Sequence, residues 1–394
     1  MLKKVIRLVV VVLVSLFAVI YLTGNGFVFQ IVSKVLETGR TTAGIDDYLY
    51  FDNAEIPPSD NPQAWPFHDD YNRIASQPSL DRLHEELETV AFLIIKNDSI
   101  WHERYFDGYG IDSKSNSFSI IKTIVAAALS KAVETGDVQS EDQKVIDFLP
   151  WLTGDHAKEV SMGDLASMSS GLKWKEDYEN LLTITPRTYV EKDMASLMKT
   201  IPIEAEPGQR FVYQSGSTQL LAMALQQATG KPIRTLLRDY FWNPMGVESP
   251  TSWILDSKSH GLEKAYCCWN ANARDFARFG KLFKNHGVWN GEQLIDSSFT
   301  AKAVRPRFEA SPQHGYGWWL GDVDGKAFFS MRGHLGQYVI VLPAYDLIVS
   351  PHSRSKDFAL MLSLPCTTRF KSVSYRMVVE SAACALSFWD DRIL

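Results

Sequence analysis

The chain has 394 residues, a formal net charge of −6 and 45% hydrophobic residues. Such a chain can bury a large core, arranged as one large domain or two smaller ones. Charges of both signs are spread along it without a long basic tract, so we do not expect nucleic acid as a partner.

The first predicted element is an apolar helix at the N-terminus. The stretch from Leu8 to Leu22 carries no charged residue and follows three basic residues, Lys3, Lys4 and Arg7. It is barely long enough to cross a bilayer as a helix. Basic residues on its N-terminal side keep that end in the cytoplasm and place the rest of the chain outside.

Two interpretations of this segment are open. A cleaved signal peptide would need a cleavage site, and Gly24-Asn25-Gly26 is a poor one. The other interpretation is an uncleaved single-pass anchor over residues 1–24 in the inner (cytoplasmic) membrane, with the lipid bilayer as its partner. We expect the anchor, and in either case the body on the periplasmic or extracellular side.

Residues 25–75 are predicted to be a juxtamembrane linker, because "NAEIPPSDNPQAWPFHDD" is rich in Pro, Asp and Asn without a sustained period. The single domain of the chain is then expected over residues 76–394. Its first part, "VAFLIIKNDSIWHERYF", has two apolar runs around a polar turn and predicts a β-hairpin.

The next predicted element is a buried helix within "NSFSIIKTIVAAALSKAV", residues 116–133. Its apolar run has no polar stripe at helical spacing, which indicates burial on nearly every side. A mostly helical region follows to about residue 300, and includes "TQLLAMALQQATGK", which Gly230 ends.

Strands return near the C-terminus, in "HGYGWWLGDVDGKAFFSMRGHLGQYVIVLPAYDLIVSPHS", before a last predicted helix in "YRMVVESAACALSFW". Strands at both ends with helices between them predict an α+β fold. In this fold one antiparallel sheet, flanked by helices, takes strands from both ends of the chain, and a mostly helical subdomain is inserted.

Several kinds of site are excluded by the motifs. There is no H-E-x-x-H, no G-x-S-x-G and no Gly-rich phosphate loop, and the nine His show no metal-ligand spacing. We therefore expect neither a metal nor a cofactor. Of the four Cys, the adjacent Cys267 and Cys268 are poorly placed to bridge each other, and small buried hydrophobes are the favoured interpretation.

The pattern Ser-x-x-Lys remains, and it occurs four times, at Ser119/Lys122, Ser170/Lys173, Ser196/Lys199 and Ser353/Lys356. Only the first opens a buried helix, where positions i and i+3 share one face. Burial would depress the lysine pKa, so that a neutral amine could accept the serine proton. Alternatively the serine is a helix N-cap and the lysine reaches out to solvent.

Two later segments favour the catalytic interpretation. "PGQRFVYQSGSTQLL" places Tyr213-Gln214-Ser215 before a helix, and "MRGHLGQYVIVLP" places His334-Leu335-Gly336 at the start of a strand. With Ser119-x-x-Lys122 in front, the chain resembles the serine β-lactamase and penicillin-binding protein superfamily over about residues 85–390. It is most similar to the class C β-lactamase-related branch, which includes esterases, D-aminopeptidases and 6-aminohexanoate-oligomer hydrolases.

This resemblance implies a serine hydrolase domain over residues 76–394, working without a metal. Ser119 would be the nucleophile, Lys122 its proton acceptor, and Tyr213 the group that relays protons to the leaving group and to water. The backbone N–H groups of Ser119 and Gln337 would form the oxyanion hole. The resemblance also implies binding roles for three further residues, Ser215, His334 and Gly336.

The departures from the family pattern concern the substrate. His334-Leu335-Gly336 replaces Lys-Thr-Gly, which removes a permanent cation, and Ser215 replaces the usual Asn. Both changes point to a small ester or amide as substrate. A D,D-carboxypeptidase or β-lactamase on the same scaffold is one alternative, and a catalytically silent, tethered binding protein is another. In "AYCCWNANARDFARFG", Cys267 and Cys268 stand where relatives often have Gly-Gly, and either narrow the pocket or pack in the core.

Overall fold

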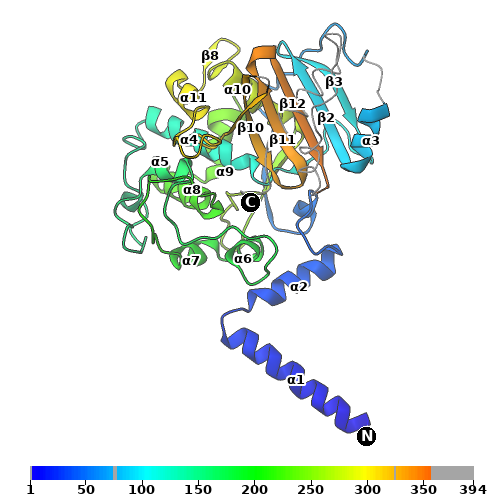
Figure 1. The fold of residues 1–394 in the computed structure, drawn as a ribbon, viewed down its shortest axis with the longest axis vertical. Helices are drawn as coiled ribbons and strands as arrows, with labels where there is room; N and C mark the ends of the chain where they lie inside the picture. The colour runs from blue at the N-terminus through cyan, green and yellow to red at the C-terminus, as the bar shows by residue number, and fades with distance from the viewer. Residues whose placement is uncertain (1, 74–77, 324, 356–394) are drawn as a thin grey trace.

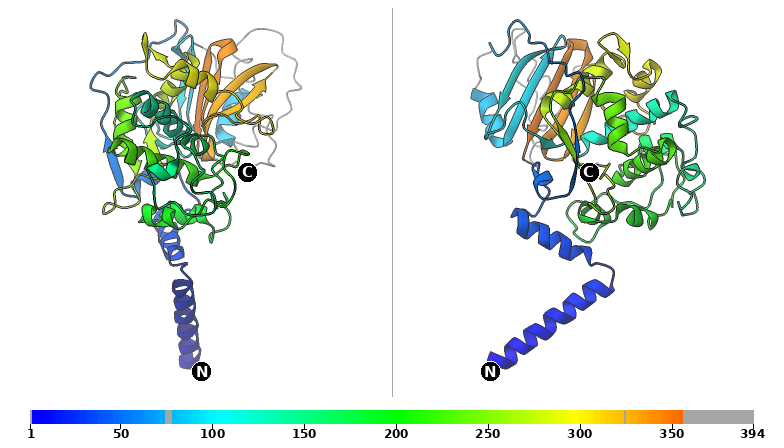
Figure 2. Two further views of the ribbon diagram at one scale, coloured as in Figure 1. Left: turned by 90° about the vertical axis from the view of Figure 1, so that its left-hand side faces the viewer. Right: turned by 180° about the vertical axis from the view of Figure 1, so that it is seen from behind.

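The computed structural model describes residues 2–73, 78–323 and 325–355. Figure 1 shows a sheet beside a mostly helical region, and Figure 2 shows two N-terminal helices projecting from one end of this body. The helices are α1 (Leu2–Leu22), α2 (Phe27–Thr38), α3 (Pro78–Glu86), α4 (Ile120–Glu134), α5 (Met162–Ala166), α6 (Ile184–Val190), α7 (Met194–Lys199), α8 (Ser215–Thr229), α9 (Ile233–Leu237), α10 (Ala273–Lys284) and α11 (Ser297–Ala303).

The main sheet has six antiparallel strands in the order β3-β2-β12-β11-β10-β9. The predicted hairpin is present as its first two strands, and β12 joins them to the C-terminal strands through pairs that include Val349 with Ile94. The prediction of one sheet built from both ends of the chain is therefore confirmed. Its strands are β2 (Thr89–Lys96), β3 (Ser99–Tyr105), β9 (Trp319–Val323), β10 (Lys326–Gly333), β11 (Gln337–Leu342) and β12 (Leu347–Ser353).

Side chains alternate across this sheet and divide the core into two layers. Val339 and Val341 of β11 face the main core, where α4 and α10 lie. Ile340, between them in the sequence, faces the opposite side and packs in a cluster with Leu80 of α3 and with Leu87, which directly follows α3. Helices thus cover both faces of the sheet, as the α+β prediction requires.

A second sheet has the order β1-β5-β6-β4. Its strands are β1 (Asn53–Ile56), β4 (Ser115–Asn116), β5 (Thr251–Ile254) and β6 (Trp269–Ala271). A separate short hairpin consists of β7 (Val288–Trp289) and β8 (Glu292–Gln293). Because β4 leads directly into α4, the second sheet fixes the position at which that helix begins.

The segment predicted to be a linker is folded along much of its length, which the sequence interpretation missed. β1 pairs with β5, the side chains of Ile45, Ile56 and Trp65 are buried, and α2 packs its Phe27 against α6. These contacts come from single residues at irregular spacing and from a partner strand about 200 residues away. Neither leaves a periodic pattern in the composition. The predicted helix in "YRMVVESAACALSFW" falls outside the described residues.

Candidate active site

The N-terminus of α4 is positioned by an unusual backbone turn. Phe118, which precedes Ser119, has a φ of 43°, in the left-handed region that side chains rarely adopt. Its N–H donates to the Asn116 side chain at 2.9 Å, and the N–H of Ser117 donates to the Trp269 carbonyl at 2.8 Å. Ser119 makes no side-chain capping bond, and among the described residues its N–H has no partner. The Ser119 hydroxyl is thus not used to cap its own helix, and the Ser119 N–H can donate to a bound molecule.

Lys122 does not reach solvent. Its side chain is buried, and Nζ donates to Ser119 Oγ at 2.7 Å and to the Tyr266 carbonyl at 2.6 Å. No carboxylate of the described residues forms an ion pair with it. Burial lowers the pKa of Lys122 to about 8, and the negative charge of Glu176 opposes this shift. A neutral amine in contact with a serine hydroxyl can act as a general base.

Tyr213 lies beside this pair, in the loop before α8. Lys122 Nζ is 5.4 Å from the centre of its ring. Burial raises the pKa of the Tyr213 hydroxyl well above its ordinary value, and the charge of Glu176 adds to this rise. Tyr213 therefore stays protonated at neutral pH and can donate a proton. Trp319 of β9 packs against its ring, with centroids 5.6 Å apart.

Ser215 faces a carboxylate that the sequence did not reveal as a site residue. Its hydroxyl donates to Glu176 Oε1 at 2.7 Å and its backbone N–H to Oε2 at 2.9 Å. The same carboxylate accepts from Trp174 Nε1 at 2.7 Å and from the Tyr178 hydroxyl at 2.8 Å. Four donors therefore fix Glu176 close enough to shift the pKa of both Lys122 and Tyr213.

His334, Leu335 and Gly336 form a short 3₁₀ turn (η4, His334–Gly336) between β10 and β11, where the sequence had predicted the start of a strand. The His334 ring packs edge-on to Phe118, with centroids 5.4 Å apart, and stacks on Tyr178 at 5.6 Å. The imidazole therefore lies beside Phe118, the residue that precedes Ser119.

The strand before this turn, β10, ends against the segment that precedes Ser119. A Cβ on Gly333 would come within 2.3 Å of the Ser117 carbonyl oxygen, so only glycine permits this approach. Gln337, which pairs with Gly333, begins β11. Its side chain is buried, donates to the Ser353 carbonyl at 2.6 Å, and hydrogen-bonds to His352 at 2.8 Å. Buried side-chain bonds thus fix the residue whose N–H was predicted as an oxyanion donor.

The other Ser-x-x-Lys pairs are not arranged in this way. Ser170 contacts Ser217 at 2.8 Å, while Lys173 forms an exposed ion pair with Glu204. Ser353 donates to the Leu335 carbonyl at 2.6 Å. Lys356 lies outside the described residues. Among the residues that the structure describes, the serine–lysine contact occurs at Ser119 alone.

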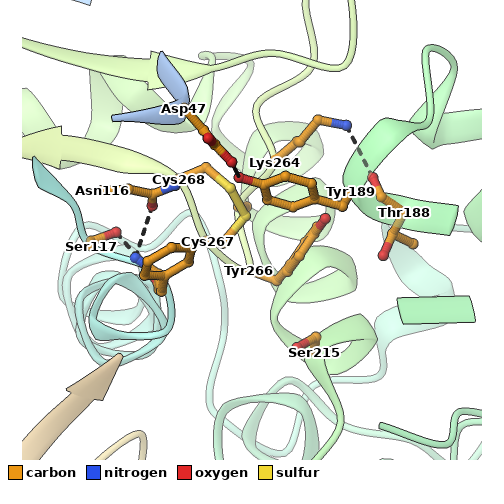
Figure 3. The surroundings of a disulfide bond; sticks show 12 residues. Asp47, Asn116, Ser117, Thr188, Tyr189, Ser215, Lys264, Tyr266, Cys267 and Cys268 are labelled. Carbon is orange, nitrogen blue, oxygen red and sulfur yellow. Dashed lines mark hydrogen bonds between the residues drawn. A yellow bond between two sulfur atoms is a disulfide. The ribbon is translucent and has the colours of Figure 1, made fainter. Parts of the chain in front are cut away.

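One sequence expectation is wrong: Cys267 and Cys268 form a disulfide with each other. Adjacent cysteines rarely have suitable geometry, but here Cys268 adopts a left-handed backbone with a φ of 76°. Figure 3 shows the disulfide between Tyr266 and the segment of Asn116 and Ser117. The other two cysteines, Cys366 and Cys384, lie outside the described residues.

A group that could ligate a metal occurs at Asp193, Asp256 and His260, whose ligand atoms lie within 4.8 Å of one another. These atoms already have protein partners. Asp193 caps α7, Asp256 accepts the backbone N–H of Met194 at 3.0 Å, and His260 contacts the Lys192 carbonyl at 2.8 Å. The expectation of a metal-free site stays a prediction.

Comparison with known proteins places this geometry in a family. The family model described as Beta-lactamase matches residues 80–357. The 6-aminohexanoate-dimer hydrolase of Paenarthrobacter ureafaciens is 22% identical over 238 residues, which are 58% of this chain and 60% of that protein. The chain thus spans less than two thirds of the length of this relative.

Solved structures share the fold. A putative 6-aminohexanoate-dimer hydrolase from Bacillus anthracis superposes with a TM-score of 0.67 at 22% identity, covering 77% of this chain and 85% of its own. EstCE1, a hydrolase with promiscuous acyltransferase activity, gives a TM-score of 0.56 at 14% identity, with coverage of 71% and 94%. At these identities the likeness is one of fold.

Proposed function

Because this chain belongs to the beta-lactamase family, we propose that it is a serine hydrolase, which cleaves a small amide or ester through an acyl-enzyme on Ser119. The observation that carries the proposal is the 2.7 Å contact between Ser119 Oγ and the buried amine of Lys122. An amine whose pKa is lowered to about 8 has a neutral fraction near neutral pH that an ordinary lysine lacks, and this fraction grows as the pH rises.

In the proposed mechanism Lys122 takes the proton of Ser119 as Oγ attacks the substrate carbonyl carbon. The N–H groups of Ser119 and Gln337 hold the negative oxygen of the tetrahedral intermediate. Tyr213, which is protonated, gives its proton to the departing nitrogen or oxygen and regains one from the Lys122 ammonium. Water then attacks the acyl-enzyme with the same groups acting in reverse, which releases the acid and restores Ser119.

For the substrate we favour a linear amide or a small ester. Two of the similar proteins are named as hydrolases of the 6-aminohexanoate dimer, and another as a hydrolase with acyltransferase activity. His334 stands where a lysine would hold the carboxylate of a β-lactam, and the hydroxyl of Ser215 is engaged by Glu176. The alternative β-lactamase or D,D-carboxypeptidase would be revealed by covalent labelling with a fluorescent penicillin.

A fluorophosphonate probe should label the protein on Ser119, because among the described residues this serine alone contacts a buried lysine. Peptide mapping by mass spectrometry identifies the modified residue. Ser119→Ala should abolish labelling, and Ser170→Ala, which alters another Ser-x-x-Lys pair, should leave it intact. Adducts at Ser170 or Ser196 would contradict the assignment, and a folded protein without any adduct would favour the silent binding protein.

We also propose that α1 anchors the enzyme in the membrane. Its 21 residues span about 31 Å at about 1.5 Å per residue, close to the thickness of the hydrocarbon core. By length and composition it is a candidate span, and a signal sequence passes the same test.

If α1 is an anchor, the protein should stay in the membrane pellet after washing with alkaline carbonate, and detergent should release it. Its intact mass should include residues 1–24. Replacing Val10 and Val12, exposed in the middle of α1, by lysine should move the protein to the soluble or misfolded fraction. A soluble wild-type protein that lacks these residues would instead show a cleaved signal.

A further inference from the structure

The Cys267–Cys268 disulfide lies next to the proposed general base. Both side chains are buried, and Cys268 has a φ of 76° although it is not glycine. The residue before the pair, Tyr266, supplies the carbonyl that accepts from Lys122 Nζ at 2.6 Å. This carbonyl and Ser119 Oγ are the two hydrogen-bond acceptors of the amine among the described residues.

The residue after the pair contacts the nucleophile loop. The carbonyl of Trp269 accepts the N–H of Ser117 at 2.8 Å, and Ser117 stands two residues before the nucleophile. Carbonyls of the pair itself are also engaged. That of Cys267 accepts Trp253 Nε1 at 2.8 Å, and that of Cys268 accepts the N–H of Ile254 at 3.0 Å. The backbone of residues 266–269 thus connects the disulfide to both members of the serine–lysine pair.

We propose that the Cys267–Cys268 disulfide is a positioning element of this active site: it holds the 266–268 backbone in the conformation that keeps the Tyr266 carbonyl on Lys122, so that the reduced enzyme is much less active. The inference rests on the proposed function of Ser119 and Lys122. In this proposal the disulfide supports Lys122 indirectly, through the Tyr266 carbonyl, and the support depends on the redox state of the two cysteines.

The physical argument concerns the left-handed residue. A non-glycine residue at positive φ is disfavoured unless its surroundings hold it there. The bond between the two Sγ atoms closes a small ring that includes the peptide between Cys267 and Cys268, and so restricts their backbone. Once it is broken, the sulfur atoms must move from bonding to van der Waals distance within a packed core. Cys268 can then leave the left-handed region, which displaces the Tyr266 carbonyl two residues before it.

Two double variants separate backbone positioning from other effects. Cys267→Ala with Cys268→Ala removes the bond and leaves a side chain at the left-handed position. Its kcat/KM should fall by about 10- to 100-fold, the scale of a small misplacement of a catalytic group. Cys267→Ala with Cys268→Gly also removes the bond, but glycine adopts positive φ freely, so its activity should be close to wild type. Equal losses in both variants, or no loss in either, would overturn the proposal.

The pH profile provides a readout that lost folding would not change. The Tyr266 carbonyl stabilises the charged form of Lys122, so its displacement should move the acidic limb of kcat/KM to lower pH in the alanine double variant. If the acidic limb of kcat/KM stayed at the wild-type pH and only the maximal kcat/KM were lower, the variant would simply contain less folded enzyme, and this result would count against the proposal.

Reduction of the wild-type enzyme tests the same point if the alanine variant fails to fold. A thiolate of dithiothreitol attacks one Sγ and forms a mixed disulfide, and its second thiol then displaces that cysteine. The reagent is oxidised to its cyclic disulfide, and both cysteines gain an electron and a proton.

Activity should fall with the fraction of the reduced pair, measured by mass spectrometry after alkylation, and return on reoxidation. The Cys267→Ala, Cys268→Gly variant should not respond to the reagent, and this control excludes effects through Cys366 and Cys384. Fully reduced wild-type enzyme with undiminished activity would refute the inference. Absence of fluorophosphonate labelling at Ser119 in the oxidised wild type would refute the proposed function instead.

Discussion

Replacing Lys122 by arginine should lower kcat/KM by about 10²- to 10⁴-fold, nearly as much as replacing it by alanine, because a general base is lost in both. Arginine keeps a positive charge and a long side chain, but its guanidinium does not lose a proton in a protein. A lysine that served only as a buried cation would tolerate the change better. The contact of Nζ with Ser119 Oγ, 2.7 Å long, is the reason to expect otherwise.

The pH dependence of the wild-type enzyme tests the same assignment. The pKa of Lys122 is lowered to about 8 by burial, so the amine is mostly charged below this pH and mostly neutral above it. Only the neutral form can accept the Ser119 proton. The acylation rate, followed as kcat/KM, should therefore rise with pH through about 8 and lose this limb in Lys122→Arg.

A matched control comes from Lys264, a second buried lysine whose pKa burial lowers to about 7 and whose Nζ donates to the carbonyls of Thr188 and Glu191. Lys264→Arg introduces the same change in volume without a serine partner. We expect it to reduce thermal stability and to leave kcat/KM per folded molecule close to wild type. A Lys122→Arg enzyme with near-normal kcat/KM, checked for folding by circular dichroism, would make Lys122 structural.

The parts of the site that could be predicted are those that depend on local spacing. Ser119 and Lys122 are one turn apart on a helix, so their contact follows from the helix period once burial is inferred from the apolar run. The main sheet could be predicted because its strands have alternating or continuous apolar runs. The order of the motifs carried the family resemblance, and this resemblance predicted roles for Tyr213 and His334.

The parts that were missed depend on contacts between distant or irregular segments. Glu176 lies in a loop without periodicity, and its hydrogen bonds to Ser215 join residues 39 positions apart. The bond between Cys267 and Cys268 requires a left-handed backbone at a cysteine, which residue preferences argue against. β1 adds to its sheet through a distant partner in a segment whose composition resembles a linker. None of these features has a sequence signal as strong as Ser-x-x-Lys.

Replacing Tyr213 by phenylalanine should also lower kcat by about 10²- to 10⁴-fold, because it removes the acid that we assign to the leaving group. The substitution keeps the ring, and hence its packing on Trp319 and its position 5.4 Å from Lys122 Nζ. It deletes only the hydroxyl. Burial and the charge of Glu176 raise the pKa of this hydroxyl, so it stays protonated in the wild-type enzyme. The phenylalanine variant has no hydroxyl, and a change of pH therefore cannot restore its activity.

The size of the effect should depend on the leaving group. An amide nitrogen must be protonated to depart, whereas p-nitrophenolate leaves as an anion. Tyr213→Phe should therefore impair hydrolysis of a linear amide more than that of a p-nitrophenyl ester. Tyr189→Phe is the control, since the Tyr189 hydroxyl is also buried but donates to Asp47 at 2.6 Å, and its loss should lower stability alone. If Tyr213→Phe hydrolysed the amide as fast as wild type, the proton would come from elsewhere, and Lys122 itself would be the remaining donor in contact with Ser119.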